Sequence, residues 1–300
     1  MSGPLRIAVV GAGRMGRVHL DACARAAGVR AVAVVDPVAG VRAELARAGL
    51  AVHGTVEELL AAGGFDAALV AAPSDLHLAL VSQLADAGLA ILCEKPIGVR
   101  ADDAREAAAQ VGRAGVVLQV GYWRRFVPAL VELRRRILAG ELGPVSLVSC
   151  YQWDERPPSG DFEARSGGIA IDMGVHEFDQ LRWLTGQEVE AVAAAGGAET
   201  AAALATMSGG TIGFVSLGRR FPQPDSCWAE AIGPLGHVRT PFMWGAEGEA
   251  VFRAAIAAQL EAFAAALPAG RPGGAGGEDA IAALEAAERA AAVLTRARTP

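Results

Sequence analysis

A short apolar run followed by three closely spaced glycines constrains the fold of this chain more than any other feature. Residues Leu5–Val10 are almost all apolar, as in a strand that is buried on both faces of a parallel sheet. Gly11-Ala12-Gly13-Arg14-Met15-Gly16 follows directly, and Arg14–Ala27 is predicted to be a helix. Glycines at these positions allow a tight turn, close approach of a pyrophosphate to the backbone and close helix–strand packing. The helix N-terminus then offers its N–H groups to the phosphates.

The residues after this helix strengthen the prediction of a dinucleotide site. Ala31–Val35 is predicted to be a second strand, and Asp36 follows it, 20 residues after Gly16. A carboxylate at this distance accepts hydrogen bonds from the adenosine ribose hydroxyls and repels a 2′-phosphate, which favours NAD over NADP. The alternative for Asp36 is a turn residue before Pro37.

Strands and helices continue to alternate as far as Gly121, which predicts a right-handed, doubly wound parallel sheet in residues 1–121. Its later strands are predicted at Ala67–Ala71, Ala90–Cys93 and Val116–Val120, the last of them as the sixth strand. Residues 122–300 have a different rhythm and predict an α+β domain with an open, mostly antiparallel sheet. Its predicted helices are Pro128–Ala139, Ile169–Leu184, Glu247–Leu267 and Glu278–Leu294, and its predicted strands are Val145–Trp153, Val189–Ala195, Ala201–Met207, Thr211–Leu217 and Trp228–Ile232.

Lys95 is the only lysine in the chain, beside 26 arginines that make up the rest of the 27 basic residues. It follows the predicted strand Ala90–Cys93, where open α/β sheets bind their ligands. An arginine stays protonated in proteins, whereas a lysine can lose its proton when it is buried or near other charge. A retained lysine at this place therefore predicts proton transfer. The alternative is a chance survivor of biased codon usage.

Asp172 and His176 form a second candidate pair in the predicted helix Ile169–Leu184. Residues at i and i+4 share one helix face, and a carboxylate beside an imidazole can orient it for proton transfer near neutral pH. The alternatives are a surface pair without a role and a core histidine with a structural hydrogen bond. The other histidines show no spacing for a metal site, and no metal is expected.

Composition limits the class of protein. The net charge of −6 argues against nucleic acid as the main partner. The four cysteines are far apart and form no CxxC pair, which predicts free thiols in a reducing compartment. Neither a signal peptide nor a membrane span is predicted, so we expect a cytoplasmic protein.

Several segments, in this order along the chain, resemble the glucose–fructose oxidoreductase / inositol dehydrogenase / MocA family. The segments that carry the resemblance are Gly11–His19, Ala72-Pro73-Ser74-Asp75-Leu76-His77, Glu94-Lys95-Pro96, Gly121–Phe126 and Gly167-Gly168 followed by Asp172-Met173-Gly174-Val175-His176. The Glu-Lys-Pro segment together with the Asp-xxx-His helix is specific to this family, and the stretch Asp172–Asp179 looks most like the inositol 2-dehydrogenase branch.

The resemblance implies hydride transfer between NAD, with NADP less favoured, and a secondary hydroxyl of a cyclic polyol or sugar. It implies that Lys95 and His176 handle the hydroxyl proton while Asp172 orients them, in a site between the two domains. The implied cofactor contacts are Gly11, Gly13, Arg14, Met15, Gly16, Asp36, Pro73, His77 and Glu94. For His77 a structural hydrogen bond has equal weight. Arg124 and Asp154 are further candidates for substrate contact, and a structural salt bridge is the alternative for Arg124.

The family often assembles through the open face of its C-terminal sheet, which implies a homo-oligomer, a dimer or tetramer. One region departs from the family: residues Ser208–Trp244 look shortened, and Phe221-Pro222-Gln223-Pro224-Asp225 replaces an acidic-aromatic stretch. The substrate assignment to inositol therefore stays open. Two other functions are kept as alternatives: an NADP-linked keto-sugar reductase, and a non-catalytic dinucleotide sensor, which has no use for a lysine, an aspartate and a histidine together.

Overall fold

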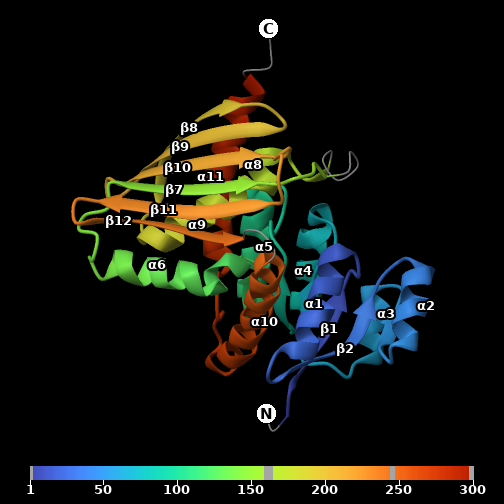
Figure 1. The fold of residues 1–300 in the computed structure, drawn as a ribbon. Coiled ribbons are helices and arrows are strands. Elements are labelled where there is room, and N and C mark those ends of the chain that lie inside the picture. Colours follow the sequence, from blue (N-terminus) through green and yellow to red (C-terminus); the bar gives the residue numbers. More distant parts are fainter. Residues whose placement is uncertain (1–2, 159–164, 244–246, 297–300) are drawn as a thin grey trace. The chain divides into compact units, whose positions relative to one another are not determined.

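The computed structural model describes residues 3–158, 165–243 and 247–296, with side chains up to residue 294. Contacts divide the chain into two compact units, which Figure 1 shows as ribbons. The first unit comprises Met1–Gly98, Asp102–Tyr122 and Arg253–Glu278, and the second comprises Val99–Ala101, Trp123–Phe252 and Asp279–Pro300.

The first unit is built on a six-stranded parallel sheet with the order β3-β2-β1-β4-β5-β6. Its strands are β1 (Leu5–Val10), β2 (Val29–Val35), β3 (Ala51–His53), β4 (Ala67–Val70), β5 (Ala90–Cys93) and β6 (Leu118–Val120). Its helices are α1 (Arg14–Arg25), α2 (Ala39–Arg47), α3 (Val56–Ala62), η1 (Ser74–Leu76), α4 (His77–Asp86) and α5 (Ala101–Ala114). The predicted doubly wound sheet is confirmed. Its central strands are apolar because both faces are covered, and Ile7, Val9, Leu69 and Ile91 have no exposed surface.

Parallel pairing brings the carboxyl ends of the strands to one edge of this sheet. Gly11 follows β1, Asp36 follows β2, Ala71 follows β4, and Glu94 with Lys95 follows β5. Ligands bind at this edge in open α/β sheets. The predicted cofactor residues and the single lysine therefore lie at one edge of one sheet.

The helix α10 (Gly248–Ala266) differs from the predicted organisation, because residues 253–278 group with the first unit and not with the second. The predicted single boundary after residue 121 is therefore not the division that the contacts give. The contacts give the reason: Arg253 pairs with Asp21, and Glu261 accepts a hydrogen bond from the Ala27 N–H. The chain runs on from α10 to Ala275, which bridges Val120 of β6.

By length and composition alone, the segment Gly248–Ala269 is also long and apolar enough to cross a membrane. A single helix of this kind is weak evidence, because core helices of soluble proteins pass the same test.

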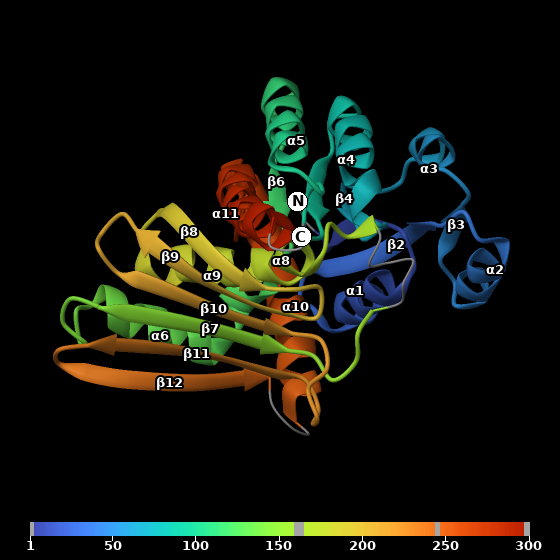
Figure 2. The ribbon, with the colours of Figure 1, turned by 90° about the horizontal axis from the view of Figure 1, so that it is seen from above.

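The second unit contains a six-stranded mixed sheet with the order β12-β11-β7-β10-β9-β8, seen in Figures 1 and 2. Its strands are β7 (Leu147–Trp153), β8 (Val189–Gly196), β9 (Thr200–Met207), β10 (Ile212–Gly218), β11 (Ser226–Gly233) and β12 (Gly236–Met243). Only the β7–β10 pair is parallel, so the predicted open, mostly antiparallel sheet is confirmed. The edge strand β12 has no counterpart among the predicted strands.

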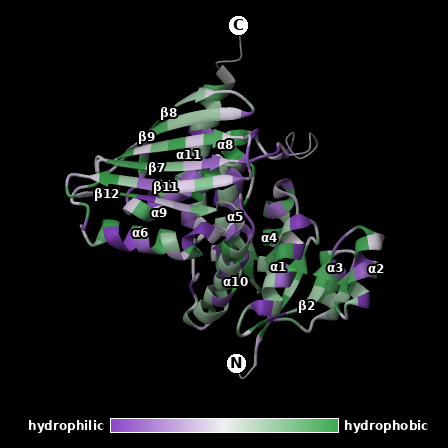
Figure 3. Cartoon of the chain, in the orientation of Figure 1, coloured by the Kyte–Doolittle hydropathy of each residue, from purple (hydrophilic) through white to green (hydrophobic). Residues whose placement is uncertain are grey.

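Helices cover one face of this sheet: α9 packs on β7 and β10, α8 on β9, and α6 on β12. Among the described residues, the helices of the unit are η2 (Trp123–Phe126), α6 (Pro128–Leu138), α8 (Ile169–Asp172), α9 (Gly174–Thr185) and α11 (Gly277–Arg296). A further turn, η4 (Leu267–Ala269), follows α10 in the first unit. The strands alternate accordingly, and Ala201, Ala203, Ala205 and Met207 of β9 are buried. The Ala-rich strands β8 to β10 are coloured mainly white to green in Figure 3.

The predicted helix Ile169–Leu184 is two helices, and this corrects the geometry of the Asp172–His176 pair. α8 ends at Asp172, Met173 lies between the helices, and α9 begins at Gly174. The His176 N–H bonds to the Met173 carbonyl, three residues back, so the α-helical ladder is interrupted here. Asp172 and His176 are therefore not successive turns of one helix.

Candidate active site

The glycine loop of the first unit has the geometry that a dinucleotide pyrophosphate requires. Gly11 has a φ of 91°, and a Cβ at this position would lie 2.8 Å from the Ala72 nitrogen. A Cβ at Gly16 would lie 1.9 Å from the Gly11 oxygen, so neither residue can be replaced without a backbone shift. A Cβ at Gly13 would meet nothing within 4 Å, which leaves open space beside the loop.

The helix that follows the loop can receive an anion at its N-terminus. No side chain caps α1, and no acidic residue lies in its first turn. Arg14 and Met15 are the first residues of this helix; Arg14 is exposed and Met15 is half-buried. The free N–H groups of a first turn favour a phosphate. These residues therefore fit the phosphate part of NAD.

Asp36 is held against the glycine loop. Its Oδ2 accepts a hydrogen bond of 2.9 Å from the Ala12 N–H, and its Oδ1 accepts one of 2.9 Å from the Val38 N–H. A carboxylate oxygen can accept two hydrogen bonds, so each still has capacity for a ribose hydroxyl. The turn role predicted as the alternative is present as well, since Asp36 bonds the N–H two residues on.

The segment Glu94-Lys95-Pro96, which we call the Lys95 segment, follows β5. Lys95 is half-buried, and its peptide bond to Pro96 is cis. Glu94 is only 7% exposed, and its Oε1 lies 2.6 Å from His19 Nε2 of α1. Burial works to raise the pKa of Glu94, but the His19 hydrogen bond and the nearby positive charges outweigh it, so the pKa is lowered. Glu94 is thus an ionised, inward-pointing group.

Pro73 and His77 occupy different environments at the end of β4. Pro73 is exposed and precedes η1. His77 is 1% exposed, and its ring nitrogens lie 2.7 Å from the Pro96 oxygen and 2.8 Å from the Ala72 oxygen. Both nitrogens therefore face backbone carbonyls. Of the two roles predicted for His77, this geometry favours the structural hydrogen bond over cofactor contact.

In the second unit, Asp172 is held by a cation that its sequence surroundings do not reveal. Arg219, at the start of the loop after β10, lies with its Nη2 3.1 Å from Asp172 Oδ2, and the Arg219 side chain is only 1% exposed. His176 of α9 is 6% exposed, and its ring meets Trp123 edge-on with the centroids 6.3 Å apart. Asp172 and His176 thus lie in one unit. Asp172 contacts Arg219, whereas His176 contacts Trp123.

Arg124 takes the structural role that was predicted as the alternative to substrate binding. Its guanidinium is buried, forms an ion pair with the fully buried Glu177, and donates to Gln152. It also lies over the Phe242 ring, 5.3 Å from the centroid. Burial works to lower the pKa of Arg124, but the Glu177 carboxylate outweighs it and raises the pKa. A guanidinium engaged in this way is a core ion pair, so the geometry does not support a substrate contact by Arg124.

Asp154, which follows β7, is a partly buried carboxyl whose pKa is raised above its ordinary value. Its Oδ1 accepts a 3.0 Å hydrogen bond from Gln152 Nε2. Burial, together with the nearby carboxylates of Asp225 and Glu177, raises the pKa of Asp154 to about 6. Perturbed carboxyls of this kind concentrate at functional sites. Asp154 therefore remains a candidate for substrate contact.

Sequence reasoning missed two partners of the candidate residues. His19 follows Gly16 by three residues and thus faces the same side of α1, which is a signal that was available. Arg219 lies 47 residues from Asp172, and no local pattern connects them. Among the described residues, no group of three or more His, Cys, Asp or Glu side chains is placed to hold a metal ion.

Comparison with known proteins adds independent information. Residues 5–122 match the family described as "Oxidoreductase family, NAD-binding Rossmann fold", and residues 130–239 match the "GFO/IDH/MocA C-terminal domain". The chain is 49% identical to the rhizopine catabolism protein MocA of Rhizobium meliloti, over 97% of this chain and 95% of that protein. It is 35% identical to the myo-inositol dehydrogenase Hyg17 of Streptomyces leeuwenhoekii, over 96% and 97% respectively.

The fold also matches solved structures. The crystal structure of GenD2 from gentamicin A biosynthesis, in complex with NAD, superposes with a TM-score of 0.90 and 28% sequence identity, covering 99% of this chain and 96% of that one.

Proposed function

The chain belongs to the GFO/IDH/MocA family of NAD-binding oxidoreductases, and from this premise we propose that it oxidises a secondary hydroxyl of an inositol-like cyclic polyol. It is an NAD-dependent dehydrogenase acting on CH–OH groups, of the inositol dehydrogenase type. The observation that carries the proposal is the shared sheet edge of the first unit. There the glycine loop, Asp36 and the only lysine follow β1, β2 and β5 of one parallel sheet.

The cofactor is NAD, and the first unit has residues suited to hold it. The loop Gly11–Gly16 and the N-terminus of α1 would take the pyrophosphate, and Asp36 would take the adenosine ribose hydroxyls. When bound, NAD supplies the hydride acceptor. The negative charge of Asp36 disfavours a 2′-phosphate, which argues against the alternative of an NADP-linked reductase.

The chain's own residues must move the hydroxyl proton. Oxidising an alcohol requires a base within hydrogen-bond reach of the hydroxyl oxygen. We assign this role to Lys95 together with His176, and in the reverse direction a cationic Lys95 would stabilise negative charge on the oxygen. Asp172 would orient these groups, and Arg219 in turn fixes the Asp172 carboxylate at 3.1 Å. Arg219 is therefore added to the proposed machinery as a positioning residue.

The substrate class rests on the relatives. The names of the two similar proteins mention myo-inositol and rhizopine, and the MocA relative is the more similar by 14 percentage points, 49% against 35%. We propose a polyhydroxylated ring compound as substrate, with inositols and rhizopines as the first candidates. Asp154 suits such a substrate, because a carboxylate accepts hydrogen bonds from ring hydroxyls. Arg124 is not assigned to the substrate, since it is engaged with Glu177.

A substrate screen tests the proposal. Purified protein is mixed with NAD and, in turn, inositol isomers, rhizopines, aldoses and their acids, and NADH is followed at its absorbance band. We expect turnover with cyclic polyols, with a ketone at the oxidised position in the isolated product. Turnover restricted to open-chain sugars would contradict the substrate class. Absence of turnover with every polyol and sugar, with NAD still bound, would contradict dehydrogenase action on this class altogether.

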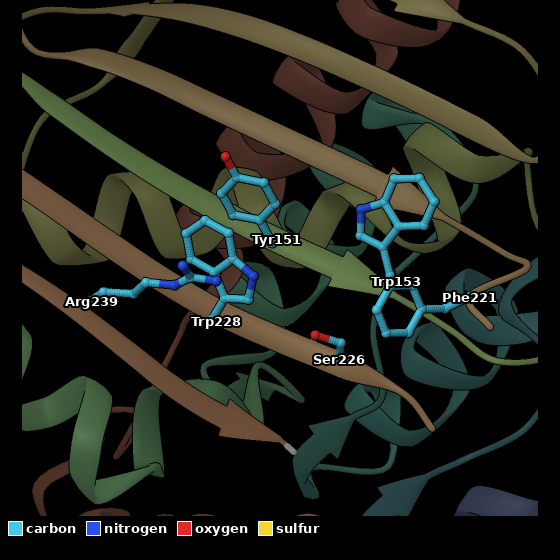
Figure 4. Close-up of a pocket in the computed structure, with 6 residues that line it drawn as sticks. All are labelled: Tyr151, Trp153, Phe221, Ser226, Trp228 and Arg239. Carbon is cyan, nitrogen blue, oxygen red and sulfur yellow. The ribbon is translucent and has the colours of Figure 1, made fainter. Parts of the chain in front are cut away.

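We also propose that the protein assembles as a dimer or tetramer through the uncovered face of the second sheet. Figure 4 shows aromatic side chains on this face, and Tyr151 stacks on Trp228 with ring centroids 3.4 Å apart. A shallow hollow of about 290 Å³ lies among Tyr151, Trp153, Phe221, Ser226, Trp228 and Arg239. Leu204 of β9 and Ile212 of β10, in the same sheet, are 52% and 41% exposed. Contiguous exposed apolar surface of this kind marks interaction sites.

The oligomer proposal is tested by light scattering after size exclusion. Trp228→Glu places a charge in the middle of this face and is expected to give monomers, whereas an unchanged mass would contradict the oligomer proposal.

We also propose a cytoplasmic location, which is supported by four buried cysteines that are all free.

A further inference from the structure

The two residues that flank Lys95 are each bound by a buried histidine from a different helix. Glu94, before it, contacts His19 of α1, and Pro96, after it, contacts His77 of α4. The exposed fractions of His19 and His77 are 0% and 1%. Histidine side chains are seldom buried so completely without a purpose for their polar atoms. Here His19 Nε2 contacts the Glu94 carboxylate, and His77 Nδ1 contacts the Pro96 carbonyl.

The sheet itself stops holding the chain just before Lys95. The Glu94 N–H donates to the Val70 oxygen, and the Cys93 oxygen accepts from the Gly121 N–H, which is the last ladder contact along β5. The Lys95 N–H turns back to Glu94 Oε2 at 3.2 Å. Pro96 has no N–H to donate. The way in which Glu94 and Pro96 are held therefore bears on the position of the Lys95 backbone.

His19 fixes the first of these residues by its Nε2. The contact with Glu94 Oε1 is 2.6 Å long and is buried, which is the geometry of a hydrogen bond strengthened by the carboxylate charge. The other oxygen of Glu94 accepts from the Lys95 N–H, so one carboxylate joins the histidine to the lysine backbone. A change at His19 would thus be transmitted to Lys95 through Glu94.

His77 fixes the second residue by its Nδ1, which lies 2.7 Å from the Pro96 oxygen, while its Nε2 lies 2.8 Å from the Ala72 oxygen. A neutral imidazole has one N–H and can donate to only one of these carbonyls. Burial lowers the pKa of His77, against the opposing effect of the two carbonyls and of the Glu94 and Asp75 carboxylates. Of the two His77 contacts, the one with Pro96 affects Lys95, because Pro96 follows Lys95 directly in the chain.

We propose that His19 and His77 are positioning residues for Lys95, acting through His19 Nε2 on Glu94 and through His77 Nδ1 on Pro96. Neither needs to touch cofactor or substrate. This role rests on the proposed function, in which Lys95 moves the hydroxyl proton, and a misplacement of about 1 Å at such a group can lower turnover by about 10²-fold.

The two histidines use different ring nitrogens, and this permits a crossed pair of substitutions. The amide nitrogen of asparagine lies near the place of Nδ1, and that of glutamine near the place of Nε2. The proposal requires the His77 proton on Nδ1; His77→Asn can then still donate to Pro96 whereas His77→Gln cannot. His19→Gln can still donate to Glu94 whereas His19→Asn cannot. Each variant is the matched control for the other at its position.

Turnover of the four variants is measured with saturating NAD and the substrate found by the screen. We expect His77→Asn and His19→Gln to stay within about fivefold of wild-type kcat, and the other two to lose about 10²-fold. Unfolding midpoints of the two variants at each position are measured alongside. A loss that follows the unfolding midpoint, or equal losses for Asn and Gln at a position, would overturn the proposal.

A second readout does not depend on activity. Because Lys95 is the only lysine, reductive methylation with ¹³C-formaldehyde labels one side chain besides the N-terminal amine. We expect the Lys95 methyl resonance to move in His77→Gln and His19→Asn and to stay near its wild-type position in their partners. An unmoved resonance in all four variants would overturn the positioning role. If the wild-type enzyme oxidised no polyol, the proposed function would fail while this resonance still decided the inference.

Discussion

Asp154 is expected to destabilise the folded protein at neutral pH, and its replacement by asparagine should make the protein more stable. Its pKa of about 6 lies above the ordinary value of 3.8 because the carboxyl is partly buried and lies near Asp225 and Glu177. In the pH range between these values the folded state holds a proton that the unfolded chain has lost. The free energy of unfolding therefore falls as pH rises from about 4 to about 6 and then stays level.

The magnitude follows from the difference between the two pKa values. Each pH unit corresponds to about 1.4 kcal/mol, so a carboxyl with a pKa of about 6 in place of 3.8 costs at most about 3 kcal/mol when it is ionised. Solvent reaches part of this side chain, which reduces the expected value to about 1–2 kcal/mol. Asp154→Asn removes the charge and keeps an oxygen that can accept from Gln152 Nε2.

Urea unfolding at several pH values between 4 and 7.5 measures the effect. We expect Asp154→Asn to be about 1–2 kcal/mol more stable than wild type at pH 7.5, with the difference disappearing toward pH 4. Asp154→Ala is the control, because it also loses the hydrogen bond to Gln152 and should gain about 1 kcal/mol less. If Asp154→Asn were no more stable at pH 7.5, or equally more stable at every pH, the buried-carboxylate reasoning would be refuted.

Three further changes test separate parts of the account. Gly16→Ala places a Cβ 1.9 Å from the Gly11 oxygen and should weaken NAD binding by at least about tenfold, measured by titration, with a wild-type affinity as the contrary result. Asp36→Ala should lower the ratio of kcat/KM with NAD to kcat/KM with NADP. An unchanged ratio would contradict a role of Asp36 in cofactor selection. Arg219→Met leaves the Asp172 carboxylate without this cation and should cost about 3 kcal/mol of stability; a smaller loss for Arg219→Lys would support the ion pair, and no loss for either would refute it.

The first unit was predictable because its signals are local. The glycines, the apolar run of β1 and Asp36 all lie within 32 residues, from Leu5 to Asp36, and each part has its own physical requirement. The strand β3, with only Ala51–His53, is too short for a pattern to show. The assignment of Lys95 to a strand end needed only the apolar run before it and is confirmed by β5.

The second unit was less predictable where distant contacts decide. The break at Met173 has no sequence marker except Gly174, which follows it, and helical spacing continues on both sides. The strand β12 carries Pro241, which argues against a strand unless it lies at an edge, as it does here. The sequence of the Ala-rich helix α10 contains no signal that predicts which unit the helix packs in. The Arg219–Asp172 contact joins residues 47 positions apart and has no local sequence signal, whereas His19, which contacts Glu94 75 positions away, is marked only by its spacing from Gly16.

The replacement of Lys95 by arginine tests the central claim most directly. Arginine keeps the positive charge but does not give up its proton at working pH, so it can bind without exchanging a proton. We expect Lys95→Arg to bind NAD with an affinity close to wild type and to lose at least about 10²-fold in kcat for polyol oxidation. Turnover at the wild-type rate in Lys95→Arg, with NAD bound normally, would contradict the assignment of the hydroxyl proton to the only lysine in the chain.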